Sequence, residues 1–333
     1  MFALTLFLKL TAKECKAQLV YVTVQNRSRL DSGGGDVIHV NTVLSPCIYN
    51  TSTCSQMIIN CTNVHQIKIG KKLGKGVSKE TFAGVFRGQD VAVKMVTPNV
   101  DDVKACTTKL KKEAGGAKIE SRTDENKDCF IFPEMKMMKE ILLISQLNHP
   151  GIIRLLGYCI RNEASVSKPD LQKHGIIAVY EKATKITSNY IKKNMLLEKR
   201  LQTAHQLAEL LDYLEHSPLG SLAMPDLKEG NLMLAGDRIK LSDLDDVGSV
   251  VKTCSKDSEC FKNVVCESGR CVGENAAGNM DRAANVFFDN LLHCGNCRNM
   301  HAEISALRRG LNNGGVTAGE AMLKLEYIQR NLN

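Results

Sequence analysis

The stretch Met224–Asp246 carries acidic, basic and amide side chains at two turns. The first turn holds Asp226, Lys228 and Asn231, and the second begins at Asp243. Strand-forming residues lie between the turns and predict a short hairpin. Because the two ends of a hairpin return to one place, we expect the turns to meet. Carboxylate and amide oxygens are the ligands that Mg²⁺ prefers, so this stretch predicts a divalent-cation site on a phosphate. An acidic surface hairpin is the alternative, but it explains the spacing poorly.

A glycine turn upstream has the composition of a phosphate-binding loop. A predicted strand from Ile67 leads into Gly74 and Gly76, and a later apolar strand ends at Lys94. This order can cover a triphosphate and place one cation on its α and β phosphates. Lys79 stands where a third glycine is usual. We expect Lys79 to contact nucleotide, and a solvated lysine is the alternative.

A helix predicted over Glu134–Leu147, with Pro133 in its first turn, should position a glutamate. Glu140 lies on the edge of its apolar face, where we expect it to hold Lys94 by an ion pair. A solvated helix glutamate is the alternative. The positions at helical spacing on that face are Met135, Met138, Ile141, Leu142 and Ser145.

Other patterns predict the connecting elements. Residues 151–159 and 175–180 favour paired strands, and 196–216 favours the longest helix, which leads into the first acidic turn. A further helix is predicted at 279–292, with an apolar face of Ala283, Val286, Phe287 and Leu291. The last helix should open with a capping box from Thr317 to Glu320.

Length and charge set broad limits. The chain has 333 residues and a formal net charge of +8, with its acidic and basic residues interleaved. This length favours one two-lobed domain plus an extension. We find no basic stripe and expect no nucleic-acid partner. Residues 1–10 form an apolar run too short to span a bilayer, which we interpret as a poor or truncated signal peptide, and we expect no transmembrane segment.

Thirteen cysteines are grouped mainly in predicted loops, which favours disulfides formed in an oxidising compartment. We expect Cys106 and Cys129 to close a polar insert of about 35 residues. The odd total leaves at least one cysteine over, with Cys15 and Cys159 as candidates. Cys294 and Cys297 favour a structural disulfide over a zinc or redox site that includes His301. The remaining cysteines are Cys47, Cys54, Cys61, Cys254, Cys260, Cys266 and Cys271.

Three N-glycosylation sequons begin at Asn26, Asn50 and Asn60, and no other sequon follows them. Their confinement to one polar segment suggests exposure to the secretory lumen. The sequence changes to tight alternation at Ile67. We therefore place an N-terminal extension at 1–66 and the main domain at 67–333.

The main domain resembles the secretory-pathway branch of the protein-kinase superfamily, in particular its extracellular tyrosine kinases, and more distantly its O-mannose and Golgi kinases. The resemblance implies an α+β, bilobal fold, with a small β-rich N-lobe at 67–181 and a helical C-lobe at 182–333. It also implies ATP with Mg²⁺ or Mn²⁺, a secreted or lumenal protein substrate, and a location in the Golgi lumen or outside the cell. The strings that carry it are Gly74-x-Gly-x-x-Lys79, Leu156-Gly-Tyr-Cys159, His216-Ser-Pro-Leu-Gly-Ser221 and Asp243-Leu-Asp-Asp246.

The same resemblance implies roles for individual residues. Lys94 and Glu140 would position the α and β phosphates. Asp226 would orient the acceptor hydroxyl and take its proton, while Lys228 would stabilise the transferring phosphoryl group. The positions implied for nucleotide binding are Gly74, Gly76, Lys79, Ala92, Lys94, Glu181 and Ala183, and those implied for metal binding are Asn231 and Asp243.

Several positions depart from the family pattern. Met224-Pro225 replaces the usual His-Arg, while Leu244 and Asp245 replace the Phe and Gly that usually follow the metal-binding aspartate. The cysteine-rich segment 254–271 stands in place of an activation segment, so we expect a disulfide-held insert and activity that loop phosphorylation does not switch. A tyrosine, a serine or threonine, or a sugar remains open as acceptor, and so does an inactive nucleotide-binding scaffold.

Overall fold

The computed structural model describes residues 58–112, 128–161, 171, 175–294 and 300–332, and the backbone alone at 18–24, 38–44, 113 and 123–127. The chain divides into two compact units, Met1–Ile58 and Ile59–Asn333. In the first unit β1 (Gln18–Val24) pairs antiparallel with β2 (Ile38–Leu44). The expectations for the first two sequons and the three most N-terminal cysteines fall outside the described residues. These are Asn26, Asn50, Cys15, Cys47 and Cys54.

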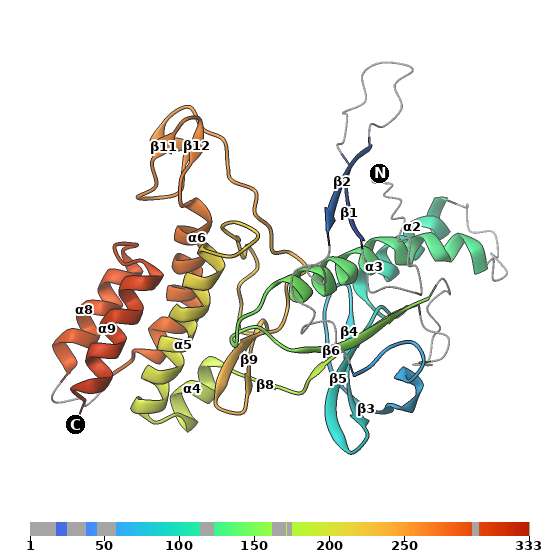
Figure 1. Cartoon of the computed structure of the whole chain (residues 1–333), viewed down its shortest axis with the longest axis horizontal. Helices are drawn as coiled ribbons and strands as arrows, with labels where there is room; N and C mark the ends of the chain where they lie inside the picture. The colour runs from blue at the N-terminus through green and yellow to red at the C-terminus, as the bar shows by residue number, and fades with distance from the viewer. Residues whose placement is uncertain are drawn as a thin grey trace. The chain divides into compact units, whose positions relative to one another are not determined.

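The second unit opens with a five-stranded antiparallel sheet in the order β3-β4-β5-β7-β6, which lies at the right of Figure 1. Alternate side chains of β4 are buried, while β7 is buried almost throughout. The predicted pairing of the strands that became β6 and β7 is confirmed. The strands are β3 (Lys68–Lys75), β4 (Glu80–Phe86), β5 (Gln89–Met95), β6 (Leu155–Ile160) and β7 (Ile176–Glu181).

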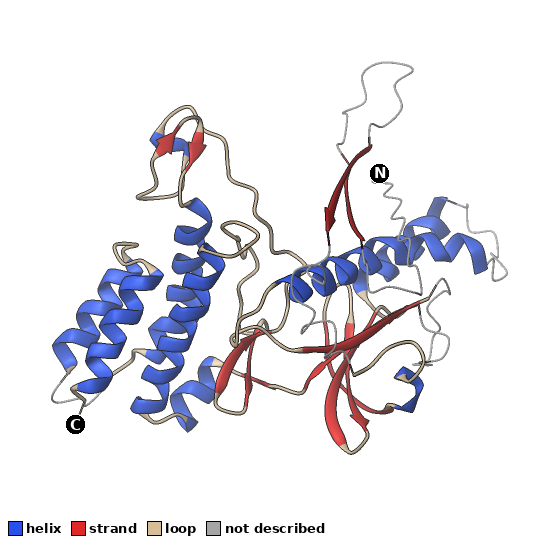
Figure 2. Cartoon of the chain, in the orientation of Figure 1, coloured by secondary structure: helices blue, strands red, loops and turns tan. Residues whose placement is uncertain are grey.

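Two helices, α2 (Asp101–Glu113) and α3 (Thr123–Gln146), lie between β5 and β6. The prediction that the helix begins after Pro133 is wrong, because Pro133 lies inside α3. The polar insert is therefore partly helical, and its predicted Cys106–Cys129 disulfide, which joins α2 to α3, is confirmed. In Figure 2 α3 is the long helix above the strands, and it contacts β6 and β7.

Glu140 lies in the middle of the buried face of α3, not on its edge as predicted. Its side chain is 0% exposed, and Met137, Ile141 and Ile144 are buried on either side of it. The predicted face was rotated, since Met135, Leu142 and Ser145 are only half-buried. The charge of a glutamate hid this position, because a carboxylate is buried only when a partner compensates it.

The following part of the chain is mainly helical, and it contains a three-stranded sheet in the order β10-β9-β8. The helix predicted at 196–216 is confirmed as α5, which contacts α9 along the bundle at the left of Figure 1. The prediction that it is the longest helix is wrong, because α3 has 24 residues and α5 has 19. The predicted hairpin is confirmed as β9 and β10, joined at Gly236, whose φ is 60°. The bounds are β8 (Thr184–Lys185), α4 (Ser188–Asn194), α5 (Leu197–Glu215), β9 (Leu232–Ala235) and β10 (Arg238–Leu241).

The predicted helix at 279–292 begins earlier and contains a wider turn. It consists of α6 (Glu274–Ala283), a π-helical turn at Ala284–Phe288 and α7 (Asp289–Leu291). A π turn adds one residue to the helical repeat and changes which side chains face inward. Phe287 and Phe288 are consequently both buried, whereas the predicted core position Val286 is half-buried.

The last two helices of the unit are α8 (His301–Asn312) and α9 (Ala318–Arg330), which contact each other. The predicted capping box is confirmed, because the Thr317 side chain accepts from the Glu320 amide and the Glu320 carboxylate accepts from the Thr317 amide. Cys294 is disulfide-bonded as expected, while Cys297 lies outside the described residues. No described helix has the length and apolar character that crossing a membrane requires.

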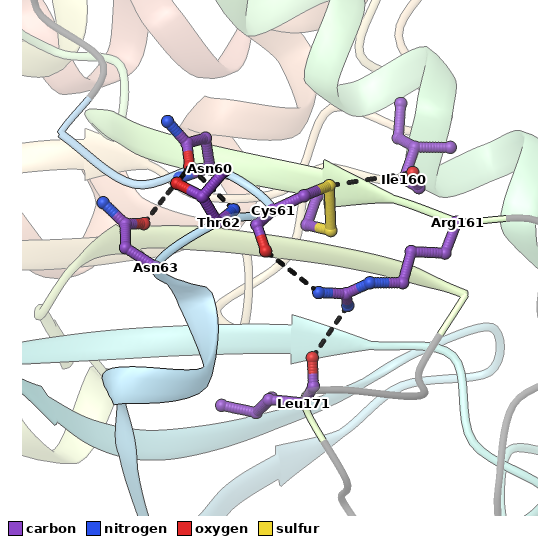
Figure 3. Close-up of a disulfide and its surroundings, with 8 residues drawn as sticks. Asn60, Cys61, Thr62, Asn63, Ile160, Arg161 and Leu171 are labelled. Carbon is purple, nitrogen blue, oxygen red and sulfur yellow. Dashed lines mark hydrogen bonds between the residues drawn. A yellow bond between two sulfur atoms is a disulfide. The ribbon is translucent and has the colours of Figure 1, made fainter.

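A disulfide between Cys61 and Cys159 fastens the start of this unit to β6, the edge strand of the sheet (Figure 3). The proposal that Cys159 is a spare thiol is therefore wrong. The connection is tight because Ile59 forms a parallel bridge with Gly157, where an added Cβ would lie 1.9 Å from the Ile59 carbonyl oxygen. Arg161 donates to the Cys61 carbonyl at 3.2 Å and strengthens the junction. The second compact unit thus begins at Ile59, upstream of the domain boundary that was predicted at residue 67.

The cysteine-rich segment after the second acidic turn folds as predicted into a disulfide-held insert. Cys254 pairs with Cys266, and Cys260 pairs with Cys271. The insert contains the short 3-10 helix Asp257–Glu259 and a two-stranded sheet of β11 (Cys266–Glu267) and β12 (Arg270–Cys271). The strand-rich part, the helical part and this insert form a bilobal, kinase-like arrangement (Figure 2).

Candidate active site

The two acidic turns meet, because the hairpin of β9 and β10 returns to its starting point. Ser242 donates from both its amide (2.8 Å) and its hydroxyl (3.0 Å) to the Asn231 carbonyl. These bonds join the first turn to the second. The side chains of Asp226, Asn231, Asp243 and Asp245 consequently line one small pocket.

Lys94, at the end of β5, forms an ion pair with Glu140 of α3 at 2.7 Å. Its ammonium also donates to the Ser242 carbonyl at 2.5 Å, next to the second acidic turn. Residues from β5, α3 and the end of β10 therefore meet at one point. A buried ion pair offsets its desolvation only when further hydrogen bonds satisfy both partners, and these contacts provide them.

Tyr180, the last buried residue of β7, completes this cluster. Its hydroxyl donates to the Glu140 carboxylate at 2.7 Å, and the Lys94 ammonium lies 4.8 Å from the centre of its ring. Burial, together with the negative charge of Glu140, raises the pKa of Tyr180 well above its ordinary value. Tyr180 thus remains a neutral donor that fixes the carboxylate of Glu140.

Lys79 is buried in the same cluster, with 6% of its side chain exposed. It forms ion pairs with Glu140, with Asp243 at 2.8 Å and with Asp245 at 3.2 Å. Burial by itself would lower the pKa of Lys79, but the three carboxylates outweigh it and raise that pKa above its usual value. The interpretation of Lys79 as a solvated lysine is therefore wrong.

The electrostatics of the second acidic turn keep Asp243 ionised. Burial opposes the charged form of this residue, but Lys94 and Lys79 outweigh burial and lower the pKa of Asp243 below its ordinary value. Asp245 differs, because burial and the neighbouring carboxylates raise its pKa despite the pull of Lys79. An ionised carboxylate at Asp243 is what a metal ligand requires.

The side-chain amide of Asn231 is the second candidate metal ligand. Its Oδ1 atom is buried and has no hydrogen-bond partner within the described part of the chain. A buried amide oxygen without a partner is costly, and a hard divalent cation prefers such an oxygen. Asn231 and Asp243 line the same pocket, so these residues fit Mg²⁺ or Mn²⁺.

Asp226 and Lys228 lie on the exposed side of the pocket and form an ion pair with each other. The hydrogen bond that Lys228 donates to the Asp226 carboxylate raises the pKa of Lys228. Both side chains are about half exposed, so an acceptor molecule can reach them. This side of the site therefore combines an accessible carboxylate with an accessible cation.

The glycine turn is the hairpin between β3 and β4. Gly76 donates its amide to the Lys79 carbonyl at 2.8 Å, which closes the turn, whereas Gly74 pairs with Thr81 in the ladder. The first turn of α2 fastens this hairpin, because Asp102 accepts from Ser78 at 2.5 Å and donates its amide to the Val77 carbonyl at 3.1 Å. The predicted insert thus supports the glycine turn.

The remaining predicted nucleotide-site residues follow the sheet. Ala92 of β5 pairs with Tyr180 in the ladder, and Ala183 is half-buried in the connection after β7. Glu181 uses its carboxylate within the protein, accepting from the Arg154 amide at 2.8 Å and pairing with Lys240 at 2.9 Å. The Glu181 carboxylate therefore stabilises the connection between the lobes through these two contacts.

Sequence reasoning missed two residues of the cluster, Tyr180 and Asp245. The sequence predicted Tyr180 only as a strand residue. Its position directly before the predicted lobe connection could have indicated that it lies near the site. Asp245 was noted only as a departure from the family pattern. The helix α2 was missed because its polar sequence suggested a loop.

Comparisons with known proteins agree with this geometry. A family model described as protein tyrosine and serine/threonine kinase matches residues 121–259. The human extracellular tyrosine-protein kinase PKDCC is 24% identical over 70% of this chain and 45% of its own length. An Arabidopsis thaliana wall-associated receptor kinase-like protein is 24% identical over 53% of this chain and 25% of its own. A probable serine/threonine-protein kinase of Dictyostelium discoideum is 26% identical over 60% of this chain and 17% of its own.

The chain thus spans less than half the length of these curated relatives. The matched family model covers the whole of α3, the hairpin and both acidic turns. Residues of the two turns line the pocket. Together with the bilobal fold, these matches show that the chain is similar to protein kinases.

Proposed function

We propose that the chain is an ATP-dependent phosphotransferase that phosphorylates hydroxyl groups of secreted or lumenal proteins. The observation that supports this most is the convergence of Lys94, Glu140 and Asp243 from three separate segments. Asp226 and Asn231 line the pocket beside Asp243. A nucleotide-binding scaffold would not need the accessible Asp226, so this position favours an enzyme.

Each residue contributes through its charge and its hydrogen bonds. ATP would supply the phosphoryl group. Asn231 and Asp243 would hold Mg²⁺ or Mn²⁺, whose charge would offset that of the phosphates. Lys94 binds phosphate oxygens while Glu140 fixes its ammonium. Asp226 accepts the proton of the acceptor hydroxyl.

Lys228 provides positive charge beside Asp226, on the acceptor side of the site. The turn with Gly74 and Gly76 covers the phosphates, while Ala92 and the backbone at Glu181 and Ala183 bind the base. The charged groups at the phosphate end of the nucleotide site are then the Asp243 and Asp245 carboxylates and two buried ammonium groups. These belong to Lys79 and Lys94.

A location in the secretory pathway, in the Golgi lumen or outside the cell, is part of this proposal. Disulfides that join distant segments, such as Cys61–Cys159, support an oxidising compartment. The relative named extracellular tyrosine-protein kinase supports it as well. That name also favours tyrosine as the acceptor, whereas a serine, a threonine or a glycan is the alternative.

Purified protein with labelled ATP tests the proposal. We expect transfer to protein acceptors in the presence of Mg²⁺ or Mn²⁺, and we expect Asp226→Asn to lower the rate at least about 100-fold because the proton acceptor is lost. Asp237→Asn, at a turn carboxylate that is 91% exposed, is the control and should retain the wild-type rate. Nucleotide binding without transfer to any acceptor would establish the scaffold instead, and transfer to O-linked sugars alone would establish a glycan kinase.

A further inference from the structure

Two departures from the kinase pattern contact each other where the strand-rich part and the helical part of the unit meet. Lys79 takes the place of the third glycine of the phosphate-binding turn, and Asp245 takes the place of the glycine that usually follows Asp243 by two positions. Their side chains form an ion pair at 3.2 Å. The pair joins the strand-rich lobe to the helical lobe, because Lys79 directly precedes β4 and Asp245 follows β10.

The two departures also balance each other in charge. Lys79 adds one positive charge and Asp245 adds one negative charge to a site where two glycines would add none. Either residue alone would change the charge around Asp243 and Glu140 by one unit. Without Lys79, the carboxylates of Glu140, Asp243 and Asp245 would lie close together. Among the described residues of this cluster, Lys94 would then be the remaining cation.

Both ends of the glycine turn are consequently held in place. On one side Lys75 pairs with Asp101 at 2.5 Å, and Ser78 donates to Asp102 of α2. On the other side Lys79 reaches the second acidic turn. A turn that usually owes its mobility to glycines is here fixed by side-chain contacts.

We propose that Lys79 and Asp245 act as one coupled pair that fixes the glycine turn against the second acidic turn and so positions the Lys79 ammonium in the phosphate subsite. Asp245 is a positioning residue in this pair, since it acts on the phosphates through Lys79. This inference rests on the proposed nucleotide-binding function and assigns it a second phosphate-facing cation beside Lys94.

A double-mutant cycle on the full chain tests the pair. The variants are Lys79→Gly, Asp245→Gly and the double variant, which restores a glycine at both positions. Unfolding in urea without nucleotide and the Kd for ATP with Mg²⁺ are measured for each. We expect Lys79→Gly to lower stability, because it exposes the three carboxylates to one another, and we expect Asp245→Gly to recover part of that loss in the double variant.

For nucleotide binding we expect each single change to raise the Kd roughly tenfold, and the double change to raise it no further, since the pair acts as one unit. Independent residues would instead raise the Kd roughly 100-fold in the double variant, which would overturn the coupling. Asp245→Glu keeps the carboxylate and should restore binding, whereas Asp245→Asn should not. The exposed pair Lys199 and Asp237 serves as the control cycle, with little coupling expected.

The two proposals fail in different ways. A wild-type chain that binds no ATP would overturn the proposed function together with the nucleotide-positioning part of this inference. Additive losses in the unfolding cycle would overturn the pair itself, even if the chain binds ATP and transfers phosphate.

Discussion

At the scale of single residues, the site depends on how buried charges are compensated. Glu140 is fully buried and accepts contacts from Lys94, Lys79 and Tyr180. A buried carboxylate with several donors is stabilised, whereas the loss of one donor leaves part of its desolvation unmet. The hydroxyl of Tyr180 is the one neutral donor among these three contacts, so its removal changes no charge.

We predict that Tyr180→Phe destabilises the fold by about 1–3 kcal/mol, because the Glu140 carboxylate loses a buried hydrogen bond. Chemical unfolding in urea measures the change. Tyr327→Phe is the matched control, since that side chain is exposed on α9 and should change stability by no more than about 0.5 kcal/mol. Equal stability of Tyr180→Phe and the wild type would show that the hydroxyl contributes nothing to holding Glu140.

At the scale of the elements, helix ends and edge strands carry specific local interactions. The last helix begins with reciprocal bonds between Thr317 and Glu320. These bonds lower the pKa of Glu320 below its ordinary value of 4.5, chiefly through the Thr317 amide. Because the folded pKa is depressed, this contribution to stability is present above pH 4.5 and is lost as the pH falls through the folded value.

We therefore predict that Glu320→Gln lowers stability at pH 7 by about 0.5 kcal/mol, a small value because the site is open to solvent. The difference from the wild type should shrink below pH 4.5 as the native carboxylate takes up its proton. Urea unfolding between pH 3 and pH 7 measures it, with Glu303→Gln on α8 as an exposed control. A difference that stays constant over this range would exclude ionisation as its cause.

The edge of the large sheet is held by a covalent bond. Cys61 and Cys159 are 98 positions apart, while Cys254 and Cys266 of the insert are 12 apart. A disulfide that closes a longer loop removes more freedom from the unfolded chain. The bond at the sheet edge should therefore contribute more to stability than the bond in the insert.

We predict that replacing both Cys61 and Cys159 by alanine costs about 2–5 kcal/mol, and that replacing Cys254 and Cys266 costs less. Urea unfolding of both pairs of variants under non-reducing conditions provides the comparison. If the insert pair cost more, loop length would not be the deciding factor, and strain relief or local packing would have to be weighed instead.

At the scale of the whole molecule, the kinase-like unit presents an N-glycosylation sequon on its surface. Asn60 is exposed, and its Oδ1 accepts from the Thr62 amide at 2.9 Å and from the Thr62 hydroxyl at 2.6 Å. The sequon thus forms a local turn beside the Cys61–Cys159 disulfide (Figure 3). Such a position can carry a glycan without disturbing the core.

We predict that Asn60 is N-glycosylated when the chain is expressed through the secretory pathway of a eukaryotic cell. Treatment with a peptide N-glycosidase should lower the apparent mass, and Asn60→Gln should remove one glycan. Asn63→Gln is the neighbouring control, because Asn63 does not belong to a sequon. If Asn60→Gln has the same mass as the wild type, and both proteins carry their disulfides, this sequon is not used.

The sequence by itself determined the hairpin, the capping box, the long helix and the meeting of the two acidic turns. Each depends on residues close together in the chain, so local spacing is sufficient to predict it. Only the tertiary structure decided that Glu140 is central in α3, that Tyr180 bonds to it, and that Lys79 is buried against Asp245. These contacts join residues that are far apart in the chain, and their energy depends on burial and compensating charge, which spacing along a chain does not encode.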